Sequence, residues 1–246
     1  MPSPFSDSSQ STTMPLLNVL TFAAIPAVAV VAGGVLASLR PPSAAMRSAV
    51  QHFAAGVVFA ALATELLPDV MHRRLPLQTI GGFAVGVVVM LLLKAFAKKK
   101  SESVDTVQVG LPTTLLIALG VDIALDGLLI GVGFAAGEKQ GLLLTIALTL
   151  EVLFLGVSAS AALSGGGATR LMIALITAGL GGLLLMGAEL GAVVLSGASN
   201  STIDVVLSFG IAALLYLVVE KLMVEAHEGP ESPWLCATFF VGFLCF

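Results

Sequence analysis

Long apolar stretches run through almost the whole chain, and short groups of charged residues, proline and serine separate them. Each stretch is close to the roughly 20 residues that a helix needs to cross a bilayer. None alternates between apolar and polar positions as the strands of a membrane barrel do. The pattern therefore predicts an all-α, polytopic membrane protein with eight transmembrane helices in one bundle. The predicted spans are residues 15–38, 50–68, 77–96, 111–136, 141–163, 169–196, 203–224 and 233–246.

Composition agrees with this prediction and leaves no room for a soluble domain. Hydrophobic residues make up 57% of the 246 residues and charged residues only 11%, with a mean hydropathy of +1.05. Soluble domains contain about 25% charged residues. The first thirteen residues, MPSPFSDSSQSTT, are polar and lack the basic start of a signal peptide. We therefore expect a disordered extracytoplasmic tail over 1–13 and a transmembrane domain over 14–246.

The distribution of Lys and Arg predicts the orientation of the bundle. If the amino terminus lies outside the cytoplasm, the outer loops hold only Arg73, Arg74 and Lys139. The inner loops then hold Arg40, Arg47, Lys94, Lys98, Lys99, Lys100, Arg170 and Lys221. This excess satisfies the positive-inside rule. It predicts a multi-pass protein of the cell membrane with both termini extracytoplasmic.

Several carboxylates lie within the predicted spans, where they are costly. An ionised carboxylate at the bilayer centre costs on the order of 3 kcal/mol on insertion scales. No Lys or Arg is expected deep enough to pair with these acids, so they are either protonated or neutralised by a bound cation. The acids are Asp122, Asp126, Glu151, Glu189 and Glu220, with Glu65 near the end of the second span.

Asp122 and Asp126 are four residues apart, so they project from one helix face and can share one ion. Carboxylates from several helices are the oxygen ligands that hard cations take. Simpler roles stay open for the other acids: a protonated hydrogen-bond donor at Glu189, an interface position at Glu65 and a surface position at Glu220.

Histidine and cysteine point to no further metal site. His52 begins a predicted span, and His72 and His227 fall in loops, so no buried histidine-rich zinc centre is expected. Cys236 and Cys245 have a spacing that fits no ligand motif, and small core residues are the simpler interpretation.

Several segments together resemble the ZIP (Zrt/Irt-like) family of metal transporters. HFAAGVVFAALATELLP, from His52, is similar to the family's second span, and DIALDGLLIGVGFAAG, from Asp122, to its fourth. MGAELGAVV, from Met186, resembles a sixth-span pattern of bacterial members, and LLYLVVEKLMVEAHE, from Leu214, the end of the seventh span. The resemblance covers nearly the whole chain in the right order. It implies eight spans, extracytoplasmic termini and transport of a divalent metal into the cytoplasm.

The metal motifs depart from the family pattern. Asp126 falls on the family's acidic fourth-span ligand, while Asp122 replaces a histidine and Ile123 an asparagine. In the fifth span Glu151 stands at the first ligand position, and Val152 and Leu155 replace polar or acidic ligands. The resemblance thus implies one metal site from Asp122, Asp126 and Glu151, with Glu189 as a further ligand or supporting residue, in place of a two-metal centre.

An all-oxygen site favours a harder cation than zinc, such as manganese, magnesium or calcium, and also accommodates ferrous iron, whereas imidazole suits zinc and other borderline metals. The resemblance implies that Glu65 and Asp69 line the outer approach and that Glu220, Glu225 and His227 receive the ion on the inner side. Alternating access would move one helix group against another. The transported divalent cation, manganese, iron, zinc or another, is a substrate. No prosthetic group, enzymatic activity or nucleic-acid partner is expected, and a homodimer is left open.

Three other functions stay open at this stage. One is a protein that keeps the fold but binds or senses a cation without transporting it. Another is a carrier of protons or of an organic substrate on titrating carboxylates. An intramembrane prenyltransferase would also use aspartates such as those of DIALD, but it needs a second aspartate motif and basic phosphate contacts that the spans lack.

Overall fold

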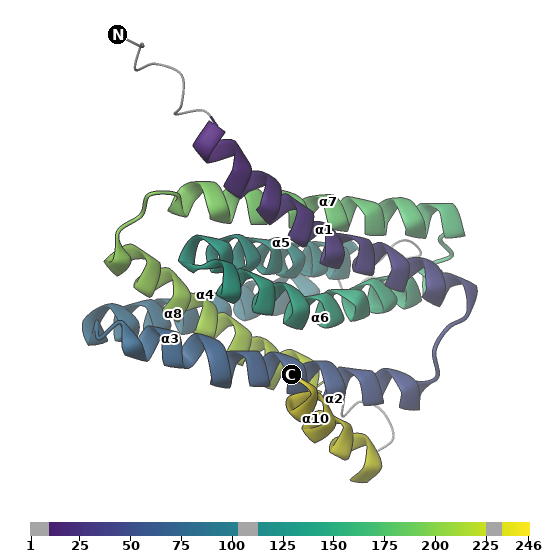
Figure 1. Cartoon of the computed structure of the whole chain (residues 1–246). Helices are drawn as coiled ribbons and strands as arrows, with labels where there is room; N and C mark the ends of the chain where they lie inside the picture. The colour runs from purple at the N-terminus through teal and green to yellow at the C-terminus, as the bar shows by residue number, and fades with distance from the viewer. Residues whose placement is uncertain (1–9, 103–112, 225–232) are drawn as a thin grey trace.

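The chain forms an all-α bundle (Figure 1). A computed structural model describes residues 10–102, 113–224 and 233–246. Two of the helices pass through a π-helical turn, labelled η, without a break in the helix. The elements are α1 (Gln10–Leu39), α2 (Ala44–Ala61), η1 (Leu62–Leu66), α3 (Leu67–His72), α4 (Pro76–Glu102), α5 (Thr113–Ala136), α6 (Glu138–Gly165), α7 (Arg170–Leu195), α8 (Asn200–Leu217), η2 (Val218–Leu222) and α10 (Pro233–Cys245).

Seven helices of the described ranges are long and apolar enough to cross a membrane: Leu17–Leu39, Ala44–His72, Pro76–Ala95, Leu115–Ala136, Glu138–Gly165, Arg170–Leu195 and Asn200–Glu220. Each overlaps one of the predicted spans. The eighth predicted span corresponds to α10, which is apolar but only 13 residues long. At 1.5 Å per residue α10 reaches about 20 Å, less than the ~30 Å of a bilayer core.

Two boundaries differ from the prediction. Helix α1 begins at Gln10, inside the segment predicted as a tail, while residues 1–9 lie outside the described ranges. Helix α2 begins at Ala44, where Ser43 caps it by accepting a hydrogen bond from the Met46 backbone N–H at 3.2 Å. His52 therefore lies two turns inside a helix and is only 2% exposed, whereas the sequence places it at the start of a span.

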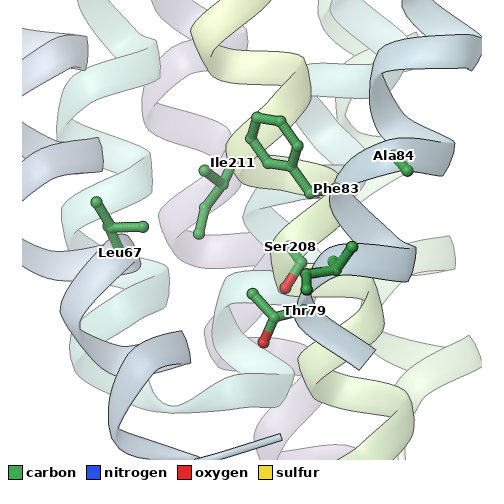
Figure 2. A pocket seen from close by; sticks show the side chains of 7 residues that line it. Leu67, Thr79, Phe83, Ala84, Ser208 and Ile211 are labelled. Atoms are coloured by element: carbon green, nitrogen blue, oxygen red, sulfur yellow. The ribbon is translucent and has the colours of Figure 1, made fainter. Parts of the chain in front are cut away.

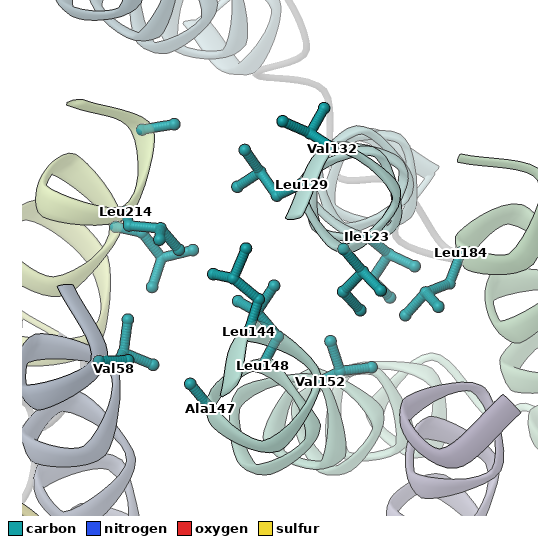
Figure 3. Close-up of a cluster of buried hydrophobic side chains, with 14 of the residues drawn as sticks. Val58, Ile123, Leu129, Val132, Leu144, Ala147, Leu148, Val152, Leu184 and Leu214 are labelled. Atoms are coloured by element: carbon teal, nitrogen blue, oxygen red, sulfur yellow. The ribbon is translucent and has the colours of Figure 1, made fainter. Parts of the chain in front are cut away.

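The surface and the interior both suit a lipid environment. Large apolar side chains lie exposed on the outside of the bundle, among them Val28, Leu36 and Leu77. Such extensive exposed apolar surface is what a lipid-facing protein presents. Inside, α5 and α6 supply much of the core (Figure 3), where Ile123 and Leu148 are both fully buried. The bundle has the helix lengths and outer surface of a multi-pass membrane protein.

The chain also contains an internal repeat, which the sequence alone does not reveal clearly. Helix α2 and its π-turn span Ala44–Ala61 and Leu62–Leu66, and α8 and its π-turn span Asn200–Leu217 and Val218–Leu222. Each bound of α8 and η2 lies the same number of residues after the corresponding bound of α2 and η1. The N-caps keep this offset too, since Ser43 before α2 and Ser199 before α8 each accept a hydrogen bond from the backbone N–H three residues on.

The helix contacts repeat with the same offset. A Cβ built on Gly86 of α4 would lie 2.9 Å from the Phe209 carbonyl oxygen of α8. At the equivalent positions, a Cβ on Gly242 of α10 would lie 2.1 Å from the Phe53 carbonyl oxygen of α2. Helices α4 and α8 therefore pack as α10 and α2 do, through the close approach that small residues allow in membrane bundles.

The two halves of the repeat have opposite directions. Gly34 of α1 approaches Thr177 of α7, and Gly181 of α7 approaches Ala27 of α1. The residue numbers rise along one helix as they fall along the other, so these equivalent first helices are antiparallel. The fold is thus an inverted repeat, α1–α2–α4 and α7–α8–α10, with α5 and α6 between the halves.

Candidate functional site

Asp126 and Glu151 lie near the midpoints of α5 and α6, the two helices between the repeats. Asp126 is 1% exposed and Glu151 is fully buried. Near the α5–α6 connection, a Cβ on Gly133 would lie 2.6 Å from the Leu144 side chain. Asp126 lies ~7 residues before Gly133 in α5, and Glu151 lies ~7 residues after Leu144 in α6. Because ~7 residues make about two helical turns, Asp126 and Glu151 lie on the same helix faces as Gly133 and Leu144 and at the same depth in the bundle. The antiparallel packing thus places these two residues on the sides of α5 and α6 that face one another.

Asp122 lies one turn from Asp126 on the same side of α5 and is half-buried. All three acids take part in polar or electrostatic interactions. Across the described ranges, no group of three or more His, Cys, Asp or Glu side chains is arranged to hold a metal ion. Val152 and Leu155, which stand at ligand positions of the resembled family, are buried and apolar. The centre of the bundle is therefore a carboxylate pair in apolar surroundings.

Glu189 does not face this pair. Its exposed side chain lines an outward-facing groove between α5 and α7, together with Val121, Leu125 and Leu128 of α5. At 100° per residue these α5 positions point roughly away from Asp126. In this conformation α5 separates Glu189 from the carboxylate pair, so its role as a ligand stays a prediction.

At one end of the bundle, the predicted outer-approach residues are engaged in ion pairs. This is the η1 end, where α5 joins α6 and α8 begins. Glu65, in η1, pairs with Lys139 at the start of α6 at 2.8 Å. Asp69 pairs with Arg73 one turn further on at 3.1 Å. Neither pair is deeply buried, so each acid has its charge neutralised near the surface of the bundle.

At the opposite η2 end, where α1 joins α2, Glu220 in η2 pairs with Lys94 of α4. The expectation that no basic residue reaches the acids of the spans is therefore wrong for Glu220, as it is for Glu65. In both pairs the lysine stands in a different helix, so only the packing of the helices shows the pair. Glu225 and His227, predicted on the inner side, lie outside the described ranges.

The structure adds two buried polar pairs to those expected from sequence. Ser48 and His52, 2% exposed each, lie one turn apart in α2, with the Nδ1 of His52 2.9 Å from the Ser48 carbonyl oxygen. At the equivalent positions of α8 lie Asp204 and Ser208, at 0% and 1% exposure. Asp204 was not expected as a site residue. Its i, i+4 relation to Ser208 on an apolar helix is the same signal that marked Asp122 and Asp126.

No protein-family model matches the chain, and a comparison with curated proteins finds no match.

Proposed function

We propose that the protein is a membrane transporter for a divalent cation and that Asp126 and Glu151 form the central binding site. The observation that carries this proposal is the position of the two carboxylates, both buried near the midpoints of the adjacent helices α5 and α6. Two carboxylates buried in one apolar interior call for a cation or a proton to neutralise them. Intramembrane acids that face a bundle interior commonly mark ion pathways.

The inverted repeat supports transport in particular. Many secondary transporters consist of two inverted repeats, with the substrate site near the bilayer midplane where the repeats meet, and they alternate access by moving one group of helices against another. The carboxylate pair occupies that place between α1–α2–α4 and α7–α8–α10. Ion pairs at both ends, Glu65–Lys139 and Glu220–Lys94, are suited to break and form as each side opens.

The finer parts of the proposal follow the family resemblance. They are membership of the ZIP family, α10 as an eighth crossing, extracytoplasmic termini and inward movement of a cation harder than zinc. Asp122 is proposed as a third ligand because it lies one turn from Asp126 on the same side of α5. Glu189 is left out of the proposed site because it faces the groove.

Metal uptake by proteoliposomes tests the proposal, with manganese, ferrous iron, zinc and magnesium supplied in turn. We expect uptake of at least one of these ions and its loss to background in Asp126→Asn and in Glu151→Gln. Glu189→Gln is the matched control, since it removes a carboxylate on the far side of α5 and should keep uptake near that of the wild type. Wild-type uptake in Asp126→Asn would sink the proposed site, and metal binding without flux would identify a sensor instead.

A proton or organic-substrate carrier is the second candidate. The burial of Asp126 and Glu151 on adjacent helices favours it, since two neighbouring carboxylates can share one proton. A pH-sensitive dye inside the same vesicles separates the two functions. A proton carrier would show an Asp126-dependent pH change with no metal present.

A further inference from the structure

A cavity with an almost wholly apolar surface lies between α3, α4 and α8 at the η1 end (Figure 2). Its volume is about 260 Å³. Leu67, Phe83 and Ile211 line it, and Thr79 and Ser208 border it. It is separate from the Asp126–Glu151 pair, which belongs to α5 and α6.

Asp204 connects the two hydroxyl-bearing residues. The Thr79 hydroxyl lies 3.0 Å from Oδ2 of Asp204 and 3.0 Å from the Leu75 carbonyl oxygen, so it shares its one proton between two acceptors. Ser208 lies one turn from Asp204 on the same face of α8. Three side-chain oxygens from two helices therefore meet beside the cavity.

Two of these groups are buried without a hydrogen-bond partner. They are Oδ1 of Asp204 and the hydroxyl of Ser208, on side chains at 0% and 1% exposure. Asp204 also makes no ion pair with any side chain that the structure describes. Burying a polar group without a partner is destabilising, and burying a charged one is more so. A ligand that accepts lone pairs from oxygen and carries positive charge would satisfy both atoms.

We propose that Asp204, Ser208 and Thr79 bind a monovalent cation of the sodium class. Hard cations take carboxylate, hydroxyl and carbonyl oxygens, which are the donors that this cluster presents. One carboxylate balances one positive charge, whereas a divalent ion would keep a surplus charge at a place where charge is costly. The cavity has room for a few water molecules of ~30 Å³ each to complete the coordination.

The other half of the repeat serves as an internal comparison. At the equivalent positions α2 carries Ser48 and His52, with no carboxylate. A neutral hydroxyl and an imidazole lack the charge that a sodium ion requires. The cation site is therefore expected in the α8 half alone, with one ion per chain.

Equilibrium binding of radiolabelled sodium to the purified full chain in nanodiscs tests this proposal. We expect saturable binding of one ion per chain and a higher melting temperature in sodium chloride than in choline chloride at equal ionic strength. Asp204→Asn should abolish both effects, and Ser208→Ala should raise the Kd for sodium roughly three- to tenfold, the effect of losing one modest interaction. Ser160→Ala is the matched control, because Ser160 is another fully buried serine without a hydrogen-bond partner, on α6. It should leave sodium binding unchanged.

If Asp204→Asn does not fold, Thr79→Val and Ser208→Ala, compared with Thr79→Ser, decide the question by their sodium Kd. No saturable sodium binding by the folded wild type would overturn the proposal, as would binding that Asp204→Asn leaves intact. A melting temperature that depends on pH but not on sodium would show that Asp204 takes up a proton instead. Binding at this site does not rest on the proposed transport of a divalent metal: Asp126→Asn should abolish metal uptake and keep sodium binding, so the two proposals fail separately.

Discussion

The two halves of the inverted repeat share a backbone plan but differ in polar chemistry. Helices α2 and α8 have matched N-caps, matched π-turns and matched glycine contacts to their outer neighbours, α10 and α4. Yet where α2 carries Ser48 and His52, α8 carries Asp204 and Ser208. The small residues and the helix bounds are shared, so we infer that the architecture requires them. The buried polar residues differ, so they reflect the separate roles of the two ends of the bundle.

A π-turn in the same place in both halves supports this distinction between the shared backbone and the differing polar residues. Such turns are rare and occur frequently at functional sites. Each one here contains a glutamate that pairs with a lysine of another helix, Glu65 with Lys139 and Glu220 with Lys94. The carboxylate of Asp204 has no counterpart in α2, where the equivalent residue is Ser48.

The largest effect is expected at the glycines that the halves share. Gly242→Ala forces a Cβ to 2.1 Å from the Phe53 carbonyl oxygen, so α10 must shift from α2. Overpacking of this kind costs about 1–3 kcal/mol. Gly86→Ala should cost less, because its closest neighbour is the Ala212 Cβ at 2.7 Å. Thermal unfolding in detergent measures both changes.

Gly81→Ala is the control for these two variants, since nothing lies within 4 Å of a Cβ at that position. It should be neutral or should stabilise α4 by up to about 1 kcal/mol, as alanine is the better helix former. Equal destabilisation by Gly81→Ala and Gly242→Ala would contradict the close packing of α10 on α2.

An intermediate effect is expected from the two hydroxyls that connect α4 and α10 to their inner neighbours. Thr79 donates to the carboxylate of Asp204, whereas Thr238 bonds the Ala49 carbonyl oxygen at 2.9 Å. Thr79→Val leaves a second buried carboxylate oxygen without a donor and should cost about 1–2 kcal/mol in sodium-free buffer. Thr238→Val should cost about 0.5–1 kcal/mol, because its acceptor is a neutral carbonyl.

The melting temperatures of Thr79→Val and Thr238→Val give the comparison directly, with Thr79→Ser as the variant that keeps the hydroxyl. A larger fall in melting temperature in Thr238→Val than in Thr79→Val would mean that the hydrogen bond from Thr79 does not stabilise the carboxylate of Asp204.

The smallest effect is expected at the ion pair of the η1 end. Lys139→Met removes the partner of Glu65, but the lysine side chain is 71% exposed. Exposed ion pairs contribute about 0–1 kcal/mol, and salt screens them. We therefore expect a slight fall in melting temperature that disappears in high salt. A large fall that persists in high salt would show that the membrane buries this pair.

Sequence reasoning recovers the helices well, because a membrane requires long apolar segments and forbids breaks within them. It also finds Asp126 and Glu151 as acids inside the predicted spans, and the structure buries both of them. Their mutual orientation depends on how α5 packs against α6, which no local pattern encodes. The pairing of Lys94 with Glu220 is missed for the same reason.

The repeat is hidden for another reason. Between the halves, many apolar residues are replaced by other apolar residues, and several polar positions change as well, as from Ser48 to Asp204. What persists is a sparse set of positions where the backbone sets the requirement, such as Ser43 and Ser199 or Gly86 and Gly242. Only superposing the contacts makes that set visible.

Gly137 alone connects α5 to α6, and continuous backbone hydrogen bonds flank it on both sides, from its own N–H to Gly133 and from the Gly141 N–H to its carbonyl. A linker of one residue gives the two helices no slack at that end. We therefore expect α5 and α6, with Asp126 and Glu151, to move as one rigid unit. A large rearrangement of the protein would then come from movement of the other helices relative to this unit.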